Sequence, residues 1–509
     1  MHTNNKASVQ IFRCGCLSLL MLTVSGCDTG SNDSEPIAAA VEREPQAAMA
    51  SAPTADAAVP GGVNMRLIGH HDLQGRSSYH PIPHRYDDRL IMFVGHHAGE
   101  TMNSLTGEVE VNGMSVLDIT DPSAPVLLHH EPPSGEARFT QHIQVCNGDA
   151  LPNGDPAKTY LVRTDGNLGA ELLDVTDPAD PVFMSTIYTT GLSEGGERET
   201  HKIQWECESG IAYLNGTPEG WRETRILQLF DLGNPDEPRH IRDFGLIGTE
   251  PGSTGPIATQ LHQPFVNGNR LYLGYGASSN GVMQIVDVDK LLNGDPNAED
   301  PFAPTPENLL YPQISRLNMP TYYGAHTAKP IYGMEIADYA DNAAHKVIDI
   351  AVLVSEETSN ECSSDRDVMF LVDITQEDKP FPISTFQVAE EPGDYCHRGV
   401  RFGPHSPQDA YHPNFDKRLL LLAYFNGGVR AVDIRDPYAP KEVGYYVPEI
   451  TELTFEMCGN VAGARVCNTQ VQTNNVNIDD RGYIYTLDRA GTGMHILELT
   501  GAAADIAGL

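Results

Sequence analysis

The sequence predicts an all-β fold, a seven-bladed β-propeller of four-stranded antiparallel blades in which the N-terminal strand closes the last blade. Three observations predict it. One unit recurs seven times along the chain, each full unit contains four strand-like runs, and the last unit ends one strand short. Repetition of a four-stranded antiparallel unit is typical of a propeller.

The repeated unit is clearest in residues 116–128, Val-Leu-Asp-Ile-Thr-Asp-Pro-Ser-Ala-Pro-Val-Leu-Leu. Its first apolar run predicts a strand that is buried on both faces. Thr-Asp-Pro predicts a tight turn, because Asp accepts a hydrogen bond from the backbone two residues on and Pro presets φ. The second apolar run predicts the outer strand. Further copies begin near positions 172, 230, 285, 372, 432 and 495.

The sixth unit shows all four strands. They are predicted, from the inside outward, at residues 399–405, 418–423, 429–433 and 442–446, with a hairpin at Asn426-Gly-Gly. The seventh unit stops after its third strand, at residues 494–498. Met65–His71 resembles the missing outer strand, so we expect it to complete the last blade and hide two open sheet edges. Dividing residues 63–499 by seven gives roughly 62 residues per unit, above the usual blade period.

Four segments follow from composition. Residues 1–27 have a basic start, an apolar core at 17–24 too short to span a bilayer, and Val-Ser-Gly-Cys27, which is typical of an export signal. Residues 28–62 are poor in large apolar side chains and predict a disordered tether. Residues 63–499 form the propeller, and residues 500–509 form a short tail.

The end of the signal resembles the lipobox of bacterial lipoproteins. This resemblance implies that Cys27 is lipidated, and that the protein is exported and anchored to a membrane, in the periplasm or at the cell surface. The Leu-Leu-Asp-Val-Thr-Asp-Pro type of repeat resembles the LVIVD repeat family of bacterial secreted propellers, which implies the fold but not the chemistry.

The net charge of −36 predicts that the protein has no nucleic-acid partner, because an acidic surface repels phosphates. A salty habitat explains the charge equally well. Cations, metals and basic partners remain compatible with it.

Six cysteines lie in the predicted propeller, and an even count in an oxidising compartment predicts disulfides. Cys458–Cys467 would close a short loop. Cys362–Cys396 and Cys146–Cys207 would link neighbouring blades. The alternative is that one or two of these cysteines are soft metal ligands.

The strongest chemical signal is a histidine in the innermost strand of unit after unit. The candidates are His80 (with His84), His142, His201, His262, His326 and His405, while the seventh unit has Asn474 and Asn475. Innermost strands line the central channel of a propeller, so these imidazoles should converge. The local alignment places His142 one residue off His201, and such a slip can turn a side chain into a blade interface.

Converging imidazoles suit copper, zinc, iron or nickel. A structural ring of hydrogen-bonded imidazoles and an anion-binding or pH-sensitive pocket are the alternatives. Copper is favoured over zinc, by fold-level analogy with the His-lined propellers of copper-dependent methanethiol oxidases and nitrous oxide reductase. Glu199 and Arg398 are candidate catalytic residues near the channel mouth, and Glu356 and Glu357 are further acids there.

Two functions follow. The leading hypothesis is a lipid-anchored propeller whose channel binds a transition metal and supports redox or hydrolytic chemistry on a small molecule. The rival is a non-enzymatic scaffold that binds a protein or a glycan with its loops.

Overall fold

The computed structural model describes residues 61–134, 139–166, 169–189, 200–340, 346–389, 393–461 and 464–509. These residues lie in one compact unit, Ala55–Leu509. The predicted signal, Cys27, the tether up to residue 60 and Glu199 fall outside the described residues. No helix within the described part of the chain is long and apolar enough to cross a membrane.

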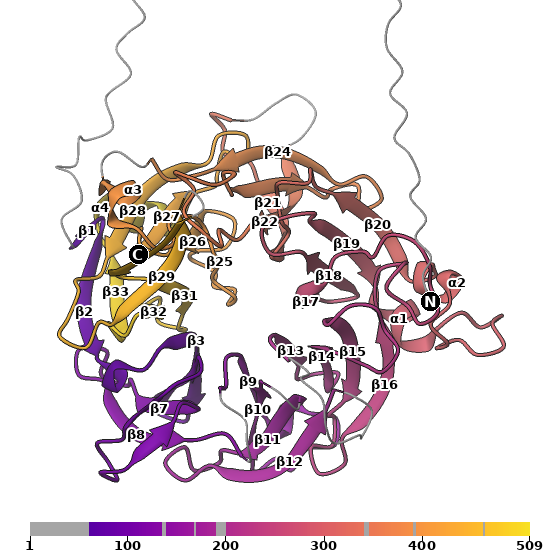
Figure 1. Cartoon of the computed structure of the whole chain (residues 1–509), viewed down its shortest axis with the longest axis horizontal. Coiled ribbons are helices and arrows are strands. Elements are labelled where there is room, and N and C mark those ends of the chain that lie inside the picture. Colours follow the sequence, from indigo (N-terminus) through magenta and orange to yellow (C-terminus); the bar gives the residue numbers. More distant parts are fainter. Residues whose placement is uncertain are drawn as a thin grey trace, which may run out of the picture. The chain divides into compact units, whose positions relative to one another are not determined.

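Seven antiparallel sheets stand around a common centre like blades, which confirms the predicted propeller (Figure 1). The first three blades are β3 (Ser78–Tyr86), β4 (Arg89–His96), β7 (Met114–Asp118) and β8 (Val126–Glu131); β9 (Ile143–Asn147), β10 (Thr159–Asp165), β11 (Gly169–Asp174) and β12 (Val182–Tyr188); and β13 (Ile203–Glu206), β14 (Ile211–Gly216), β15 (Ile226–Asp231) and β16 (Arg239–Phe244).

The fourth and fifth blades are β17 (Leu261–Asn267), β18 (Arg270–Tyr275), β19 (Val282–Asp287) and β20 (Gln313–Asn318); and β21 (Thr327–Glu335), β22 (Val347–Val354), β23 (Met369–Asp373) and β24 (Phe381–Phe386). The sixth and seventh blades are β25 (Ser406–Pro407), β26 (Leu419–Ala423), β27 (Val429–Asp433), β28 (Lys441–Val447) and the added β1 (Gly61–Val63); and β31 (Thr473–Ile478), β32 (Ile484–Asp488), β33 (Met494–Leu499) and β2 (Met65–His71).

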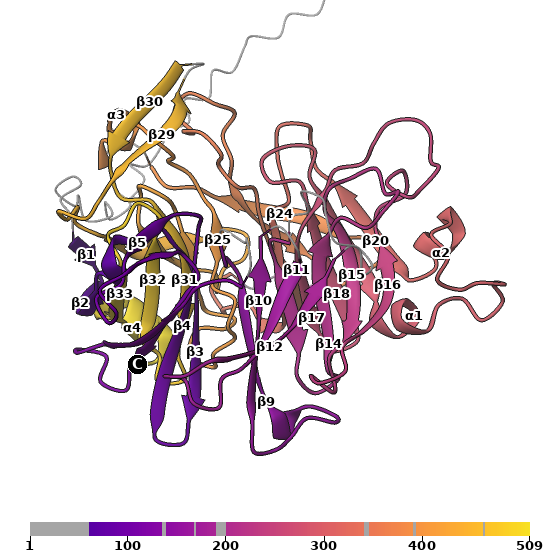
Figure 2. The same cartoon turned by 60° about the horizontal axis from the view of Figure 1, so that its bottom comes forward.

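Insertions between strands explain the long repeat period. They are η1 (Leu73–Gly75), the hairpin of β5 (Glu100–Met102) and β6 (Val109–Val111), η2 (Gly148–Ala150), α1 (Val288–Asn293), α2 (Pro306–Leu310), α3 (Tyr395–Arg398) and the hairpin of β29 (Glu456–Val461) and β30 (Ala464–Thr469). The β29–β30 hairpin projects from one face of the ring (Figure 2).

The repeated motif forms the third strand and the turn after it, as its composition predicts. In β7 every residue is buried except the half-buried Asp118, whose carboxylate accepts a hydrogen bond from the Thr120 backbone N–H at 2.9 Å. Asp121 accepts from the Ser123 N–H at 2.9 Å, which fixes the Asp-Pro turn. The same two-residue contact recurs at Asp174, Asp231, Asp373 and Asp433.

The apolar core is divided among the blade interfaces. Seven clusters of buried apolar side chains each join two neighbouring blades, and one of them joins the seventh blade to the first. Burial at roughly 25 cal/mol per Å² therefore stabilises each contact between blades, and the ring as a whole, rather than one central core. The centre is left to polar side chains.

The predicted closure is confirmed. β2 pairs antiparallel with β33 from Met65 opposite Leu499 to His71 opposite Met494, so the N-terminal strand completes the last blade. The preceding β1 pairs with β28 as a fifth strand of the sixth blade, which sequence reasoning did not anticipate. The first two strands of the propeller thus pair with the edge strands of two neighbouring blades.

The C-terminal segment, set apart as a tail in the sequence, contains helix α4 (Gly501–Ala507). Ala503 and Ala507 are buried in the cluster that joins the sixth and seventh blades. The helix therefore covers the interface that lies next to the closing strands.

All three predicted disulfides are present: Cys146–Cys207, Cys362–Cys396 and Cys458–Cys467. Cys146–Cys207 joins β9 to the end of β13 and so links two blades, as expected. The alternative role of these cysteines as metal ligands is excluded, because their sulfur atoms are bonded to each other. Disulfides are typical of exported proteins.

Candidate metal centre

Six of the seven candidate histidines meet at the centre of the ring. The rings of His80 and His142 stack with centroids 3.9 Å apart, and those of His262 and His326 lie 3.6 Å apart. His201 is 4.8 Å from His262, and His405 is 4.9 Å from His326. All six side chains are buried. His84 is not among them: it lies farther along β3, half-buried, and contacts Asn147 at 2.8 Å.

Irregular pairing at the inner strands aims these side chains at the channel. The ladder between β17 and β18 shifts at Leu261/Gln263 and leaves His262 without a paired residue, and a similar shift at Ser78/Pro81 frees His80. Such bulges redirect a side chain. His142 and His326 come one residue before the first ladder residue of β9 and β21, and His201 comes two residues before that of β13. The one-residue offset of His142 therefore does not turn it into a blade interface.

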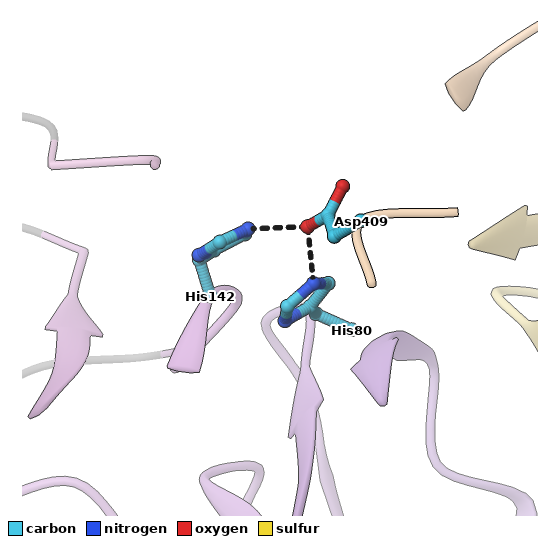
Figure 3. A group of neighbouring side chains, drawn as sticks. All are labelled: His80, His142 and Asp409. Atoms are coloured by element: carbon cyan, nitrogen blue, oxygen red, sulfur yellow. Dashed lines mark hydrogen bonds and ion pairs between the residues drawn. The ribbon is translucent and has the colours of Figure 1, made fainter. Parts of the chain in front are cut away.

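The Asp409 group consists of His80, His142 and Asp409 (Figure 3). The His80 Nε2 lies 2.8 Å from the Asp409 Oδ2, and the His142 Nε2 lies 3.5 Å from the same oxygen. Asp409 comes from the segment after β25 in the sixth blade, whereas His80 and His142 come from the first and second blades. The group brings two imidazoles and one carboxylate from three blades to one point.

The Glu356 group consists of His262, His326 and Glu356, the last from the segment after β22. The His326 Nε2 lies 3.6 Å from the Glu356 Oε2, and the His405 Nε2 lies 3.8 Å from the Oε1. Arg401 donates to the Oε1 at 2.9 Å. Glu356 was a candidate from the sequence, and its side chain faces His326 and His405.

Hydrogen bonds fix which ring nitrogen of His326 is free. The Thr327 hydroxyl donates to the Gln263 Oε1 at 3.1 Å, so its oxygen accepts from the His326 Nδ1–H at 2.7 Å. The His326 Nε2 is therefore unprotonated, and it has no hydrogen-bond partner among the described residues. The His405 Nδ1 donates to the Asn474 backbone oxygen, which leaves the His405 Nε2 unprotonated as well.

These contacts place lone pairs opposite carboxylate oxygens. Two acceptors facing each other at 3.6 Å repel unless a cation lies between them. Two ligand atoms bound tetrahedrally to one ion at about 2.0–2.2 Å lie roughly 3.3–3.6 Å apart. The spacings of 3.5 Å and 3.6 Å in the two groups match that value. The residues of both groups therefore fit a transition metal, which would replace the 2.8 Å contact between His80 and Asp409.

Burial sets the protonation of the centre. It lowers the pKa of all six imidazoles, so these rings are neutral near pH 7, the form that binds metals. Burial alone would raise the pKa of Asp409, but hydrogen bonds from His142 and His80 outweigh it and hold this pKa well below its usual range. Asp409 is therefore ionised among neutral rings.

Three further side chains complete the centre. The Tyr79 hydroxyl donates to the His201 Nε2 at 3.1 Å, and that nitrogen also lies 3.1 Å from the His262 Nε2. The fully buried Lys202 places its Nζ 4.7 Å from the centroid of the Tyr79 ring. Burial lowers the pKa of Lys202 to about 8, against the opposing pull of Asp409 and Glu356.

Sequence reasoning missed Asp409, Tyr79, His97 and Lys202. Asp409 follows His405 by four residues on the same inner segment, which is the signal that could have found it. His97 is half-buried, and its ring centroid lies 5.0 Å from that of the Tyr79 ring. Tyr79 and Lys202 are sequence neighbours of His80 and His201, and alternation alone would have pointed them away from the channel.

Arg398 is placed away from the six histidines. It ends α3, its guanidinium lies 4.8 Å from the centroid of the Tyr395 ring, and its backbone oxygen accepts from Asn468 of β30. Glu357 lies next to the centre, but it bonds Ser359 and Ser364, and burial raises its pKa to about 7.

A cavity of about 400 Å³ borders the Asp409 group. It is lined by inner-strand residues, among them Gln144, Gln204, Phe265 and Asn477, and by Asp409 and Tyr411. A volume of this size is within the range of small-molecule sites. The cavity gives Asp409 a neighbouring space.

No protein-family model matches the chain, and no curated protein matches it. Among solved structures the chain is similar to a "putative 6-phosphogluconolactonase" from Bacteroides fragilis, with 12% identity, a TM-score of 0.45, and coverage of 82% of this chain and 92% of the other. It is also similar to Sqt1 from Saccharomyces cerevisiae, with 7% identity, a TM-score of 0.45, and coverage of 86% and 99%.

Proposed function

We propose that this chain is an exported propeller whose central channel binds a transition metal, copper or zinc, through inner-strand histidines and the carboxylates Asp409 and Glu356. The observation that carries the proposal is the unprotonated, unpartnered Nε2 of His326, 3.6 Å from a carboxylate oxygen. A purely structural ring of imidazoles would pair such a lone pair with a donor.

The donor set favours a divalent ion. Nitrogen and oxygen ligands suit Cu²⁺ and Zn²⁺, and copper binds such ligands more tightly than zinc does. A bound ion supplies Lewis acidity, or redox chemistry if it is copper. The cavity beside Asp409 would admit a small molecule to that group, which supports an enzymatic role in redox or hydrolytic chemistry. Asp409 would hold the ion and the neutral rings would orient it.

Metal analysis tests the proposal. The purified protein is reconstituted with Cu²⁺ or Zn²⁺, desalted and measured by mass spectrometry for bound metal. We expect the wild type to retain metal, and the variants His80→Ala/His142→Ala and His262→Ala/His326→Ala each to lose part of it. His84→Ala is the matched control, since His84 lies outside both groups.

A wild type that retains no metal after reconstitution would overturn the metal proposal and favour the non-enzymatic scaffold. Loss of metal in the His84→Ala control would contradict the assignment of the ligands, because it would place the ion farther along β3.

We also propose that Cys27 carries a lipid that anchors the propeller to a bacterial membrane, as the lipobox resemblance implies, and that the repeat places the chain with the LVIVD propellers. The three disulfides support export. Fractionation tests the anchor: the wild type should sediment with membranes and a Cys27→Ala variant should not. Identical distribution of both would contradict lipidation.

A further inference from the structure

Two lysines of the described residues are buried near the channel, and only one of these two has hydrogen-bond partners there. Lys202 and Lys329 are at most 1% exposed. The Lys329 Nζ donates to the backbone oxygens of Gln408 at 2.8 Å and of Ala410 at 2.9 Å. The Lys202 Nζ has no hydrogen-bond partner among the described residues. The two ammonium groups are therefore equally buried, but only that of Lys329 has hydrogen-bond acceptors among the described residues.

An unpaired buried ammonium is costly, and proteins pair or hydrogen-bond buried charges almost without exception. The ring of Tyr79 is a weak partner for Lys202, since a cation over a ring gains only about 0.5–2 kcal/mol. The two carboxylates within electrostatic reach of Lys202 are already engaged, Asp409 with two histidines and Glu356 with Arg401. The protein itself leaves this donor for a ligand.

The backbone holds Lys202 in this position. Its N–H donates to the Asn215 Oδ1 at 2.8 Å, and its carbonyl accepts from the Asn215 N–H at 3.2 Å. The same Asn215 side chain donates to the His262 backbone oxygen at 2.9 Å. Lys202 therefore starts from a fixed point beside two of the six histidines, and its ammonium is not a mobile surface group.

Charge indicates what the ligand is. Lys202 adds one positive charge to a centre whose two carboxylates are Asp409 and Glu356, and Glu356 is already paired with Arg401. A divalent ion in either group would add two more, and such an excess of buried positive charge attracts an anion. We propose that the centre binds a small carboxylate or similar oxyanion, whose oxygen atoms accept hydrogen bonds from the Lys202 Nζ. The proposal deepens the metal-binding function by naming the ligand class, but the contact with Lys202 does not itself require a metal.

The anion must be small. Lys202 and Tyr79 are nearly inaccessible, at 0% and 1% exposed, so a ligand of the ammonium must enter a closed site, which favours a one- or two-carbon acid over a large substrate. Formate and formamide are a matched pair of probes for this site. They have nearly the same size and shape, and only formate is charged at neutral pH.

The experiment measures thermal melting of the full-length protein, once stripped of metal and once loaded with Cu²⁺, against increasing sodium formate or formamide. Bound metal is counted in parallel. We expect formate to raise the Tm of the wild type in both forms, more in the loaded form, and formamide to leave it unchanged. In Lys202→Met, whose side chain has similar length and no charge, the apparent affinity for formate should fall roughly tenfold. Lys329→Met is the control for loss of a buried lysine and should keep the formate response.

Four outcomes overturn the proposal. They are an equal response to formate and formamide, an unchanged formate affinity in Lys202→Met, loss of the formate response in Lys329→Met, and loss of bound metal in Lys202→Met, which would make the amine a metal ligand. The wild-type comparison stands even if Lys202→Met fails to fold. If the wild type binds formate but no metal, the metal proposal fails and the anion site stands.

Discussion

The Asp409 group and the Glu356 group offer the same donors, two imidazoles and one carboxylate, in different surroundings. Asp409 contacts the neutral rings of His80 and His142 and the Gln263 amide, and it borders the cavity. Glu356 is already paired with Arg401 at 2.9 Å. The negative charge of Asp409 would partly neutralise a divalent ion bound there. At Glu356 the ion must compete with the Arg401 guanidinium for the carboxylate. Identical ligand sets therefore predict unequal affinities, with the Asp409 group filled first.

The largest expected effect is a loss of folding stability at low pH, and the histidines of both groups contribute to it alike. Burial lowers the pKa of the six imidazoles, so the folded protein binds fewer protons than the unfolded chain below about pH 6.5. Their contribution to stability is complete above that pH and is lost as pH falls. Each histidine contributes at most about 1.4 kcal/mol per pH unit.

Three buried acids act in the opposite direction. Burial raises the pKa of Glu357 to about 7, of Asp367 to about 8 and of Asp488 to about 6, so their contributions are lost as pH rises. Six histidines outweigh three acids below pH 6.5. The urea midpoint of metal-free protein should therefore fall between pH 6.5 and 5.5, and a constant or rising midpoint would contradict the neutral ring of imidazoles.

The next effect comes from removing the disulfide that lies near each group. Cys362–Cys396 closes 34 residues between Glu356 and Arg401, while Cys146–Cys207 closes 61 residues next to His142. Loop entropy predicts that removing either one, as a double Ser variant, costs about 3–4 kcal/mol of unfolding free energy. Calorimetry should show similar losses for both.

Metal counting on the same variants should show a difference. Loss of Cys362–Cys396 should weaken the Glu356 group alone, because Cys362 lies in the segment after β22 that carries the ligand Glu356. Equal loss of metal from both groups would show that they behave as one site.

A smaller effect comes from Asp409→Asn. A carboxamide is a poor ligand, and even residues that only support a ligand change metal affinity 10- to 100-fold, so we expect a loss of at least about 100-fold at this group. Competition against a chelator measures it. Glu356→Gln is the matched variant and should spare the tighter site. If Asp409→Asn retains the tighter ion, the ranking of the two groups is wrong.

The smallest effect tests the cause of the difference. Arg401→Gln removes the cation that competes with a metal at Glu356, and it should raise the affinity of that group roughly tenfold by removing charge repulsion. The same titration measures it, with Arg398→Gln as a control outside both groups. A weaker Glu356 group in Arg401→Gln would show that the guanidinium positions the carboxylate rather than competing with the ion.

The sequence by itself determined the fold and the closing strand, because these depend on local patterns that repeat. It predicted the three disulfide pairings, and the structure decided between them and metal ligation. An apolar run ending in Asp, as at Asp118, predicts a buried strand and a turn wherever it occurs. It also predicted that histidines from successive inner strands would meet, since a propeller brings equivalent positions to one axis.

Only the tertiary structure decided which charged residues join those histidines. Asp409, Glu356 and Lys202 stand at different offsets from the repeat, and bulges at His80 and His262 break the alternation that would predict their direction. Contacts between residues from different blades depend on side-chain direction at the ångström scale, which a repeat pattern does not record. The division of one ring of imidazoles into two unequal groups therefore emerges only from the folded molecule.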